Sequence, residues 1–400
     1  METATGLRGV LAVREFRALT LAWVVSLGGD QLARVALSVL VFDRTRSAVL
    51  TATVYAVTFL PAVVGGPLLS GLADRLPRRS VLLGTDLGRG ILVLIMAIPD
   101  TPLGILLVLL FGVSALEAPF SAARGPLMRV ILADRDYRAA VGLDVTLRQL
   151  AAVFGFAGGG FLLTVVSPSV ALLVDVATFA VSGLVVLLGV HSRAAALVEP
   201  TPVARRRLLS LAGSDARSGL ETVFSHPLRR RAVLLTWVVL AGTIAPEGLA
   251  APWAAQFGGT APATGLILAA PTVGQVLALL VVTRAGAQAP ERLLFPLALL
   301  ATIPLLLCAI NPSLPVALAL LGVSGAGISM VALAQVVFVE ATPDYERGRA
   351  FGVAAAGVTT AQGIGIAVAG ALAETASPPT VVALLALVCL IGVVCVARTD

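Results

Sequence analysis

A short charged segment, SGLADRLPRR at residues 70–79, separates two apolar stretches at residues 48–72 and 80–98. Each stretch is long enough to cross the hydrocarbon core of a bilayer as a helix, which takes about 20 residues. The same alternation of apolar stretch and short polar loop continues in both directions along the chain. The segment therefore occupies the position of a loop between two membrane helices.

The composition of the whole chain agrees with this interpretation. The 400 residues are 58% hydrophobic and 12% charged, and their mean hydropathy is +0.99, whereas soluble proteins are about 25% charged. We expect an all-α membrane protein of twelve transmembrane helices, with no large soluble domain. The predicted helices are 18–41, 48–72, 80–98, 102–126, 140–165, 169–190, 232–256, 262–283, 293–310, 313–338, 350–373 and 379–397.

The arginines predict the orientation of these helices. All 28 basic residues are Arg, and 22 of them lie in the N-terminal segment, the even-numbered loops and the C-terminus, whereas the odd-numbered loops hold only Arg44 and Arg46. Cytoplasmic loops carry most of the positive charge in membrane proteins, so we expect both termini in the cytoplasm. The net charge of +6 is thus explained by loop arginines that orient the helices in the lipid bilayer, which is the expected partner. No nucleic-acid partner is expected.

The longest polar stretch, residues 191–231, divides the chain into halves of six predicted helices each, residues 1–190 and 232–400. It is predicted to be a cytoplasmic linker, in which residues 214–225 form a short interfacial helix. Two pseudo-symmetric six-helix bundles are an organisation typical of secondary transporters. Duplication is supported by two similar loop sequences, ADRDYR at 133–138 and TPDYER at 342–347.

Several classes of protein are disfavoured by what the sequence lacks. It has no phosphate-binding G-x-x-x-x-G-K-S/T loop, only two histidines (His191 and His226), and three cysteines without metal-ligand or redox spacing. We therefore expect no metal, no cofactor and no enzymatic activity. Energy for any transport would come from gradients or partners.

Charged residues within the predicted spans are costly and are expected to face a partner or a cavity. Asp30 and Arg34, and likewise Asp144 and Arg148, are spaced i and i+4, which favours ion pairs on one helix face. A paired Asp30 would hold its helix in place, whereas an unpaired one could carry a proton. Both alternatives are open at this stage.

Glu117 and Glu247 lie deep in the fourth and seventh predicted helices, and neither has an obvious basic partner at i±4. They are the better candidates for proton binding. An acid that takes up a proton outside and loses it inside can couple export to the proton gradient.

The segment at 70–79 resembles the signature loop of the major facilitator superfamily, G-x-L-A-D-R-x-G-R-R/K, with Ser70 and Pro77 in place of the two glycines. The resemblance implies that this loop helps to lock the cytoplasmic side between the two halves. Its gate residues here are Gly71, Asp74, Arg75, Arg78 and Arg79.

Further motifs are similar to the drug- and siderophore-exporter branch of this superfamily, which includes macrolide efflux proteins and the enterobactin exporter. They are Gly29-Asp30-Gln31, Asp86-Leu87-Gly88-Arg89, Asp175-Val176-Ala177-Thr178-Phe179 and Gly219-Leu220. We assign Asp86, Arg89, Arg124, Asp144 and Arg148 to a charge network that stabilises the bundle, and Asp175 to local packing or a hydrogen bond. Gly155 and Gly159 form a G-x-x-x-G face for close helix packing.

These observations predict a secondary active transporter in the plasma (inner) membrane of a bacterial-type cell. It would export amphipathic small molecules, such as a drug, antibiotic or siderophore, by alternating access with proton antiport. Sparse charge in the expected cavity and a high aliphatic content favour an apolar or amphipathic cargo over a sugar phosphate, which would need several basic groups. The alternative on the same fold is a lipid or lysolipid transporter, or a carrier for nutrient uptake.

Overall fold

The computed structural model describes residues 7–64, 76–132, 134–193, 217–285, 290–343 and 345–398. Every regular element in these ranges is a helix. Nine of the described helices are long and apolar enough to cross a membrane. The prediction of an all-α, multi-pass membrane protein is confirmed, whereas the count of twelve spans stays a prediction.

The apolar stretches of the first half become helices close to their predicted places. Ser167 caps the last of them, because its hydroxyl accepts a hydrogen bond from the Val170 amide at 3.4 Å and Pro168 follows it. The helices are α1 (Leu7–Ala12), α2 (Arg14–Thr45), α3 (Ala48–Val64), α5 (Arg78–Met96), α6 (Leu103–Ile131), α7 (Asp134–Leu162) and α8 (Pro168–Gly189).

In the second half, the prediction of one continuous helix over 232–256 is wrong, because the chain breaks at Ile244 and Leu249. Pro246 has no N–H for the carbonyl four residues earlier, and its ring crowds that carbonyl. The helices are α10 (Pro227–Thr243), α11 (Ala245–Gly248), α12 (Ala250–Ala255), α13 (Ala261–Ala285), α14 (Pro290–Leu306), α15 (Leu314–Ile328), α16 (Met330–Glu340), α17 (Arg347–Leu372) and α18 (Pro378–Ala397).

The contacts divide the chain into two compact units. Unit 1 comprises Met1–Arg44, Leu60–Val198 and Thr260–Ala269, and unit 2 comprises Thr45–Phe59, Glu199–Gly259 and Ala270–Asp400. Two segments, 45–59 and 260–269, thus group with helices from the other half of the sequence. The domain division predicted at 191–231 stays a prediction.

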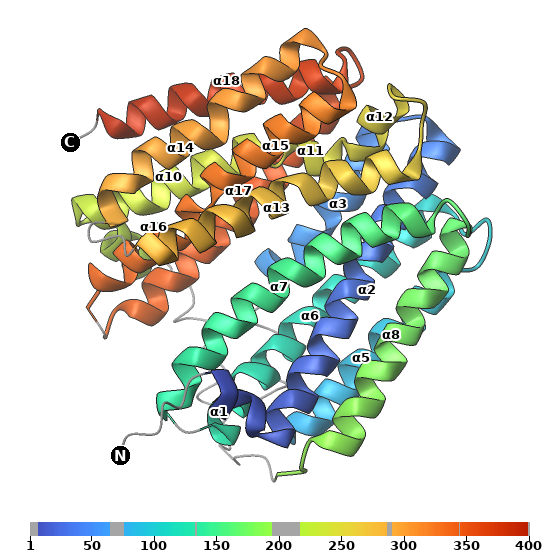
Figure 1. Cartoon of the computed structure of the whole chain (residues 1–400), viewed down its shortest axis with the longest axis vertical. Coiled ribbons are helices and arrows are strands. Elements are labelled where there is room, and N and C mark those ends of the chain that lie inside the picture. Colours follow the sequence, from blue (N-terminus) through green and yellow to red (C-terminus); the bar gives the residue numbers. More distant parts are fainter. Residues whose placement is uncertain are drawn as a thin grey trace. The chain divides into compact units, whose positions relative to one another are not determined.

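Within unit 1, α5 packs against both α6 and α8, and Figure 1 shows these helices running beside α2 and α7. The predicted glycine face of α7 is confirmed, since it lies against α2. A Cβ added at Gly155 would come within 2.7 Å of the Gly28 carbonyl oxygen, and one at Gly159 within 3.0 Å of the Leu32 Cα. The missing side chains therefore set the distance between α7 and α2.

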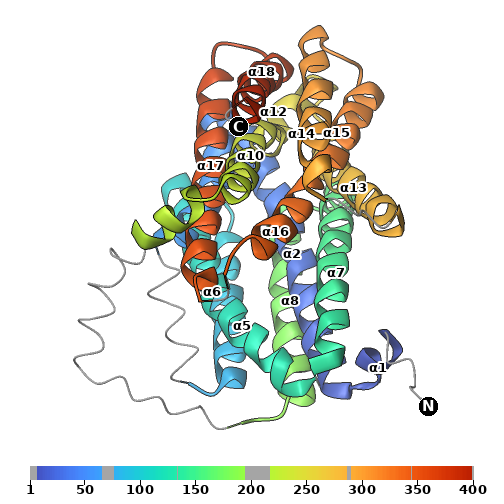
Figure 2. The ribbon, with the colours of Figure 1, turned by 90° about the vertical axis from the view of Figure 1, so that its left-hand side faces the viewer.

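Within unit 2, α10 is the central helix, because it contacts α16, α17 and α18, which surround it in Figure 2. α14 packs against α15 and α18. Buried Leu235, Val239 and Met330 fill the space between these helices.

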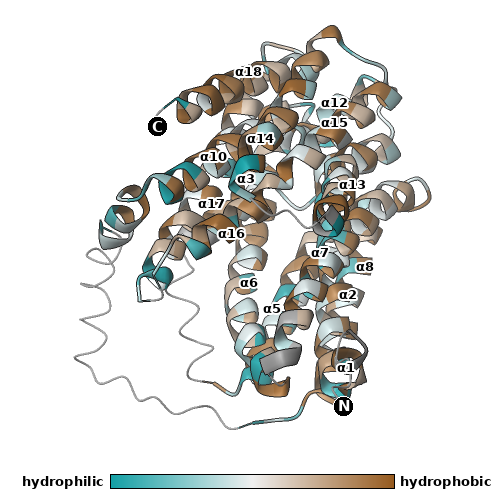
Figure 3. Cartoon of the chain, turned by 60° about the vertical axis from the view of Figure 1, so that its left-hand side comes forward, coloured by the Kyte–Doolittle hydropathy of each residue, from teal (hydrophilic) through white to brown (hydrophobic). Residues whose placement is uncertain are grey.

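The outer faces of the helices are apolar. Val108, Phe154 and Leu188 are 71%, 72% and 75% exposed, and Figure 3 shows hydrophobic residues predominating along α18. Exposed apolar surface on this scale is unfavourable in water and suits lipid.

The predicted interfacial helix at 214–225 is partly seen, since residues 217–224 are helical and residues 194–216 lie outside the described ranges. Val223 is fully buried against Val233, Phe338 and Ala350. This helix is therefore anchored within unit 2 through its second turn.

The start of α3 is capped by a residue more than three hundred positions away. Ser47 accepts a hydrogen bond from the Leu50 amide at 3.2 Å, while its own hydroxyl donates to Glu374 Oε1 at 2.8 Å. The same carboxylate oxygen accepts from the Val49 amide at 3.2 Å. These hydrogen bonds hold the pKa of Glu374 below its ordinary value of 4.5. The arrangement resembles a capping box, except that the acid comes from the turn after α17 and not from the first turn of α3 itself.

Replacing Gly155 by Val is expected to destabilise the protein by about 1–3 kcal/mol, because the new side chain overpacks the contact between α7 and α2. The readout is the thermal midpoint of the purified protein in detergent. Gly158→Val is the matched control, since a Cβ at Gly158 meets nothing within 4 Å. Equal loss in both variants would contradict this packing.

The Glu374 cap predicts a pH-dependent stability. Because the pKa of Glu374 is lowered in the folded protein, its stabilisation is fully present above the ordinary pKa and is lost as the pH falls through the lowered one. Thermal midpoints of wild type and Glu374→Gln, followed from pH 7 to pH 3, are expected to differ at pH 7 and to converge at low pH. Glu291→Gln, an exposed change on α14, serves as the control. If the thermal midpoints of wild type and Glu374→Gln differ by the same amount at every pH, the cap is refuted.

Candidate functional site

An ion pair joins two helices in the interior of unit 1. Arg89 of α5 donates from Nη2 to both carboxylate oxygens of Asp30 of α2, at 2.8 and 2.6 Å. The Arg89 and Asp30 side chains are 4% and 16% exposed. Such a pair is costly to break, because either partner alone would be a charge held away from water.

Four further ionisable groups surround this pair. Asp30 interacts electrostatically with Arg34 and with Glu117 of α6, and Arg89 interacts with Glu117 and with Asp175 of α8. Asp86, one turn before Arg89, interacts electrostatically with both members of the pair. We refer to these six residues as the charge cluster: Asp30, Arg34, Asp86, Arg89, Glu117 and Asp175.

Two of the carboxylates are held by hydroxyl groups of α8. Ser182 donates to Asp86 Oδ2 at 2.6 Å, and Thr178 donates to Asp175 Oδ1 at 3.0 Å, so Asp175 makes the local hydrogen bond expected of it. Among the described residues, Asp86 Oδ1 and Asp175 Oδ2 are buried without a hydrogen-bond partner. The Arg89 guanidinium lies 4.6 Å from the ring centre of Phe179, a cation–π contact.

Gly29 makes this convergence possible. A Cβ at position 29 would lie 2.3 Å from Asp175 Oδ1 and 2.2 Å from Thr178 Oγ1. Any side chain here would therefore push α8 away from α2. Three motif fragments that are far apart in the sequence, at Gly29-Asp30, Asp86–Arg89 and Asp175–Phe179, thus meet at one place.

The two ion pairs predicted from i,i+4 spacing are not the ones observed. Asp30 pairs with Arg89 rather than Arg34, and Asp144 pairs with Arg124 at 2.6 Å rather than with Arg148. In both cases an arginine of a neighbouring helix reaches the short Asp side chain. The guanidinium groups of Arg124 and Arg148 lie 3.9 and 5.0 Å from the ring centre of Trp23, so this second network joins α2, α6 and α7.

Only part of the predicted gate can be placed. Gly71, Asp74 and Arg75 lie outside the described residues. Arg78 and Arg79 begin α5, and Arg79 Nη2 donates to the carbonyl of Leu187 in the last turn of α8. A cation at this point satisfies a carbonyl at the end of a helix.

Glu247 lies in α11, in the interruption between α10 and α12, and is half-buried. It lies in unit 2, whereas Glu117 belongs to the charge cluster of unit 1. Interrupted membrane helices frequently form substrate and ion sites.

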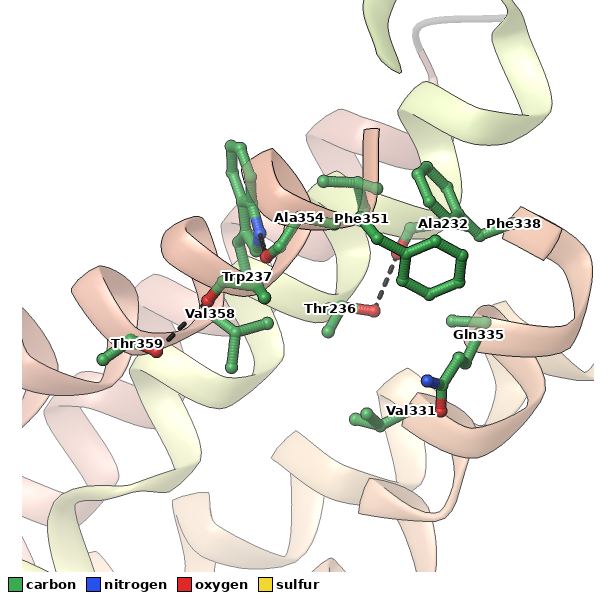
Figure 4. A pocket seen from close by; sticks show the side chains of 13 residues that line it. Ala232, Thr236, Trp237, Val331, Gln335, Phe338, Phe351, Ala354, Val358 and Thr359 are labelled. Carbon is green, nitrogen blue, oxygen red and sulfur yellow. Dashed lines mark hydrogen bonds between the residues drawn. The ribbon is translucent and has the colours of Figure 1, made fainter. Parts of the chain in front are cut away.

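Sequence reasoning missed two cavities. One, of about 460 Å³, lies between α5 and α8 and reaches Asp86. The other, of about 320 Å³, lies between α10, α16 and α17 in unit 2 (Figure 4). We refer to the second as the aromatic pocket, because Trp237, Phe338 and Phe351 line it. The clustering of aromatic residues around 224–237 and 338–351 is its only sequence signal.

Comparison with known proteins gives the family. A profile of the Major Facilitator Superfamily matches residues 19–251 and 247–400, and no curated protein sequence matches. Among solved structures, a nucleoside transporter is similar with a TM-score of 0.74 at 15% identity, over 95% of this chain and 98% of that one. A POT family transporter in complex with 5-aminolevulinic acid has a TM-score of 0.73 at 12% identity, over 98% and 95%. The identities are low, so these structures support the fold, while the profile covers nearly the whole sequence: the chain belongs to the Major Facilitator Superfamily and is a membrane transporter.

Proposed function

We propose that this transporter exports amphipathic small molecules by alternating access, in exchange for protons. The observation that carries the proposal is the charge cluster, which gathers four carboxyl and two guanidinium groups within helices α2, α5, α6 and α8. A static bundle gains little from so many ionisable groups in an apolar span, where each is costly.

The balance of charge in the cluster favours proton binding. Four ionised carboxylates against two arginines would leave an excess of two negative charges inside the helices. Binding a proton to a carboxyl group removes part of this excess without moving any helix. The cluster is therefore the proposed site of proton binding.

Asp30 and Glu117 are proposed as the two proton carriers, because Asp30 forms the ion pair with Arg89 and Glu117 interacts electrostatically with both members of that pair. A proton on Asp30 would weaken its pair with Arg89 and leave Glu117 as the remaining acidic neighbour of the guanidinium. Since Asp30, Arg89 and Glu117 lie on α2, α5 and α6, such an exchange changes how three helices are tied together.

Glu247 is proposed as a further coupling residue in unit 2, and Asp74, Arg75, Arg78 and Arg79 as the cytoplasmic gate. The orientation, with both termini cytoplasmic in the plasma membrane, follows from the arginine distribution and belongs to the same proposal. An amphipathic cargo is supported by the aromatic pocket, whose lining contains no ionisable side chain.

Uptake of a nutrient is the second candidate. The similar solved structures include a nucleoside transporter and peptide transporters. Likeness in fold leaves the direction of transport open, so the assay below measures direction.

Everted vesicles that contain the wild-type protein are expected to release an imposed proton gradient when lipophilic drugs or siderophores are added. Glu117→Gln, Asp30→Asn and Glu247→Gln are each expected to abolish this release, because the amide side chain cannot carry the proton. The measurement is quenching of a pH-sensitive dye, with labelled compound followed in parallel to give the direction.

Glu221→Gln is the control, since Glu221 is exposed and pairs only with Arg217 on its own helix among the described residues. Proton release that survives in all three variants would remove coupling from these acids. Substrate accumulation against the expected direction, or no response to nucleosides, peptides and drugs alike, would overturn export.

The Asp30–Arg89 pair predicts strong coupling in a double-mutant cycle. Asp30→Asn and Arg89→Gln are each expected to cost about 3–5 kcal/mol of stability, because each leaves a buried charge unpaired. The double variant is expected to lose much less than the sum. The readout is the free energy of unfolding in detergent. Arg34→Gln combined with Asp30→Asn is the control cycle, and a larger coupling there would reassign the pair to Arg34.

A further inference from the structure

The aromatic pocket of unit 2 is a cavity with a defined chemical character. Its volume of about 320 Å³ is at the lower end of the range for small-molecule sites, about 300–1,000 Å³. None of the thirteen side chains that line it is ionisable. A charged group would thus have no counter-ion there, whereas an uncharged ring system of one or two rings would fit.

The walls of the pocket are fixed in place. The Trp237 indole packs against α17, where a Cβ at Gly357 would come within 2.1 Å of the ring, and its Nε1 donates to the Ala354 carbonyl at 3.0 Å. Phe338 and Phe351 meet edge to face, with ring centres 5.2 Å apart. A ligand entering this space therefore meets aromatic faces that need no rearrangement, which lowers the cost of binding.

The polar groups of the pocket favour a ligand that donates a hydrogen bond. Thr236 donates its hydroxyl hydrogen to the Ala232 carbonyl at 2.8 Å, and Thr359 donates to Ala355 at 3.1 Å, so both hydroxyl oxygens keep only acceptor capacity. Gln335 is exposed and has no hydrogen bond to another described residue, and its amide can accept as well as donate, so the preference for a donor comes from the two threonines. In the view of Figure 4, the Thr236 hydroxyl lies between Trp237 and Gln335.

We propose that the aromatic pocket binds an uncharged planar aromatic group that carries one O–H or N–H donor, of the kind found in phenols and anilides. The ring stacks on Trp237, Phe338 or Phe351, and the donor is accepted by Thr236 or Gln335. This inference rests on the proposed function in one respect, since it takes the ligand to be the aromatic part of an exported molecule.

The test uses fluorescence of Trp237 in the full-length protein in nanodiscs, without any gradient. The chain has three tryptophans, so the double variant Trp23→Phe, Trp253→Phe leaves Trp237 as the one fluorophore of this type. If that variant folds poorly, the Trp237 signal is obtained by subtracting the fluorescence of the single variant Trp237→Phe from that of the wild type. The probe is 2-naphthol. Its matched competitors are a naphthyl trimethylammonium salt, which adds a charge, and 1-decanol, which has a donor but no ring.

Saturable quenching by 2-naphthol is expected, with affinity at least about tenfold weaker, or 1.4 kcal/mol, for both competitors. Ala355→Leu fills the pocket from an exposed lining position and is expected to weaken 2-naphthol binding by a similar factor. Ala356→Leu, an exposed change on the same helix outside the pocket, is expected to leave it unchanged.

Equal binding of 1-decanol would overturn the proposal and identify a groove for lipid chains. Equal effects of Ala355→Leu and Ala356→Leu, or no saturable quenching, would overturn it too. Glu117→Gln provides the separation from the proposed function, because it is expected to lose proton coupling while 2-naphthol binding persists. Naphthol binding with no drug-dependent proton flux would therefore refute the transport mechanism and leave the pocket standing.

Discussion

The cost of placing charge inside an apolar helix determines how unit 1 is built. Once Asp30 lies within α2, it needs a cation, and Arg89 supplies one from α5. The guanidinium in turn needs cover, which Phe179 of α8 gives, and α8 can approach only because position 29 is a glycine. Each step follows from the one before, so the packing of α2, α5 and α8 depends on one ion pair.

The sequence was sufficient for most of the helices and for the family. Apolar stretches bounded by charged loops predicted where α2, α6, α7, α8, α13, α17 and α18 form, because span length is set by the bilayer rather than by tertiary contacts. The G-x-x-x-G face of α7 was also predictable, since only very small residues permit such close helix contact.

The partners of the charged residues were not predictable in this way. Spacing of i and i+4 describes neighbours on one helix, but Asp30 and Asp144 take their arginines from other helices. The aromatic pocket was missed for a related reason, because it depends on which helices pack together, and a pattern along one helix does not contain this. The break at Ile244, by contrast, had a local signal in Pro246.

The capped start of α3 has a consequence for how the protein is made. Ser47 and Val49 leave the ribosome long before Glu374 is synthesised, and synthesis proceeds from the N-terminus at about 5–20 residues per second. During those tens of seconds the Val49 amide and the Ser47 hydroxyl lack their carboxylate acceptor. The start of α3 is completed only after the turn that follows α17 has been synthesised, so a late segment of the chain finishes the cap of an early helix.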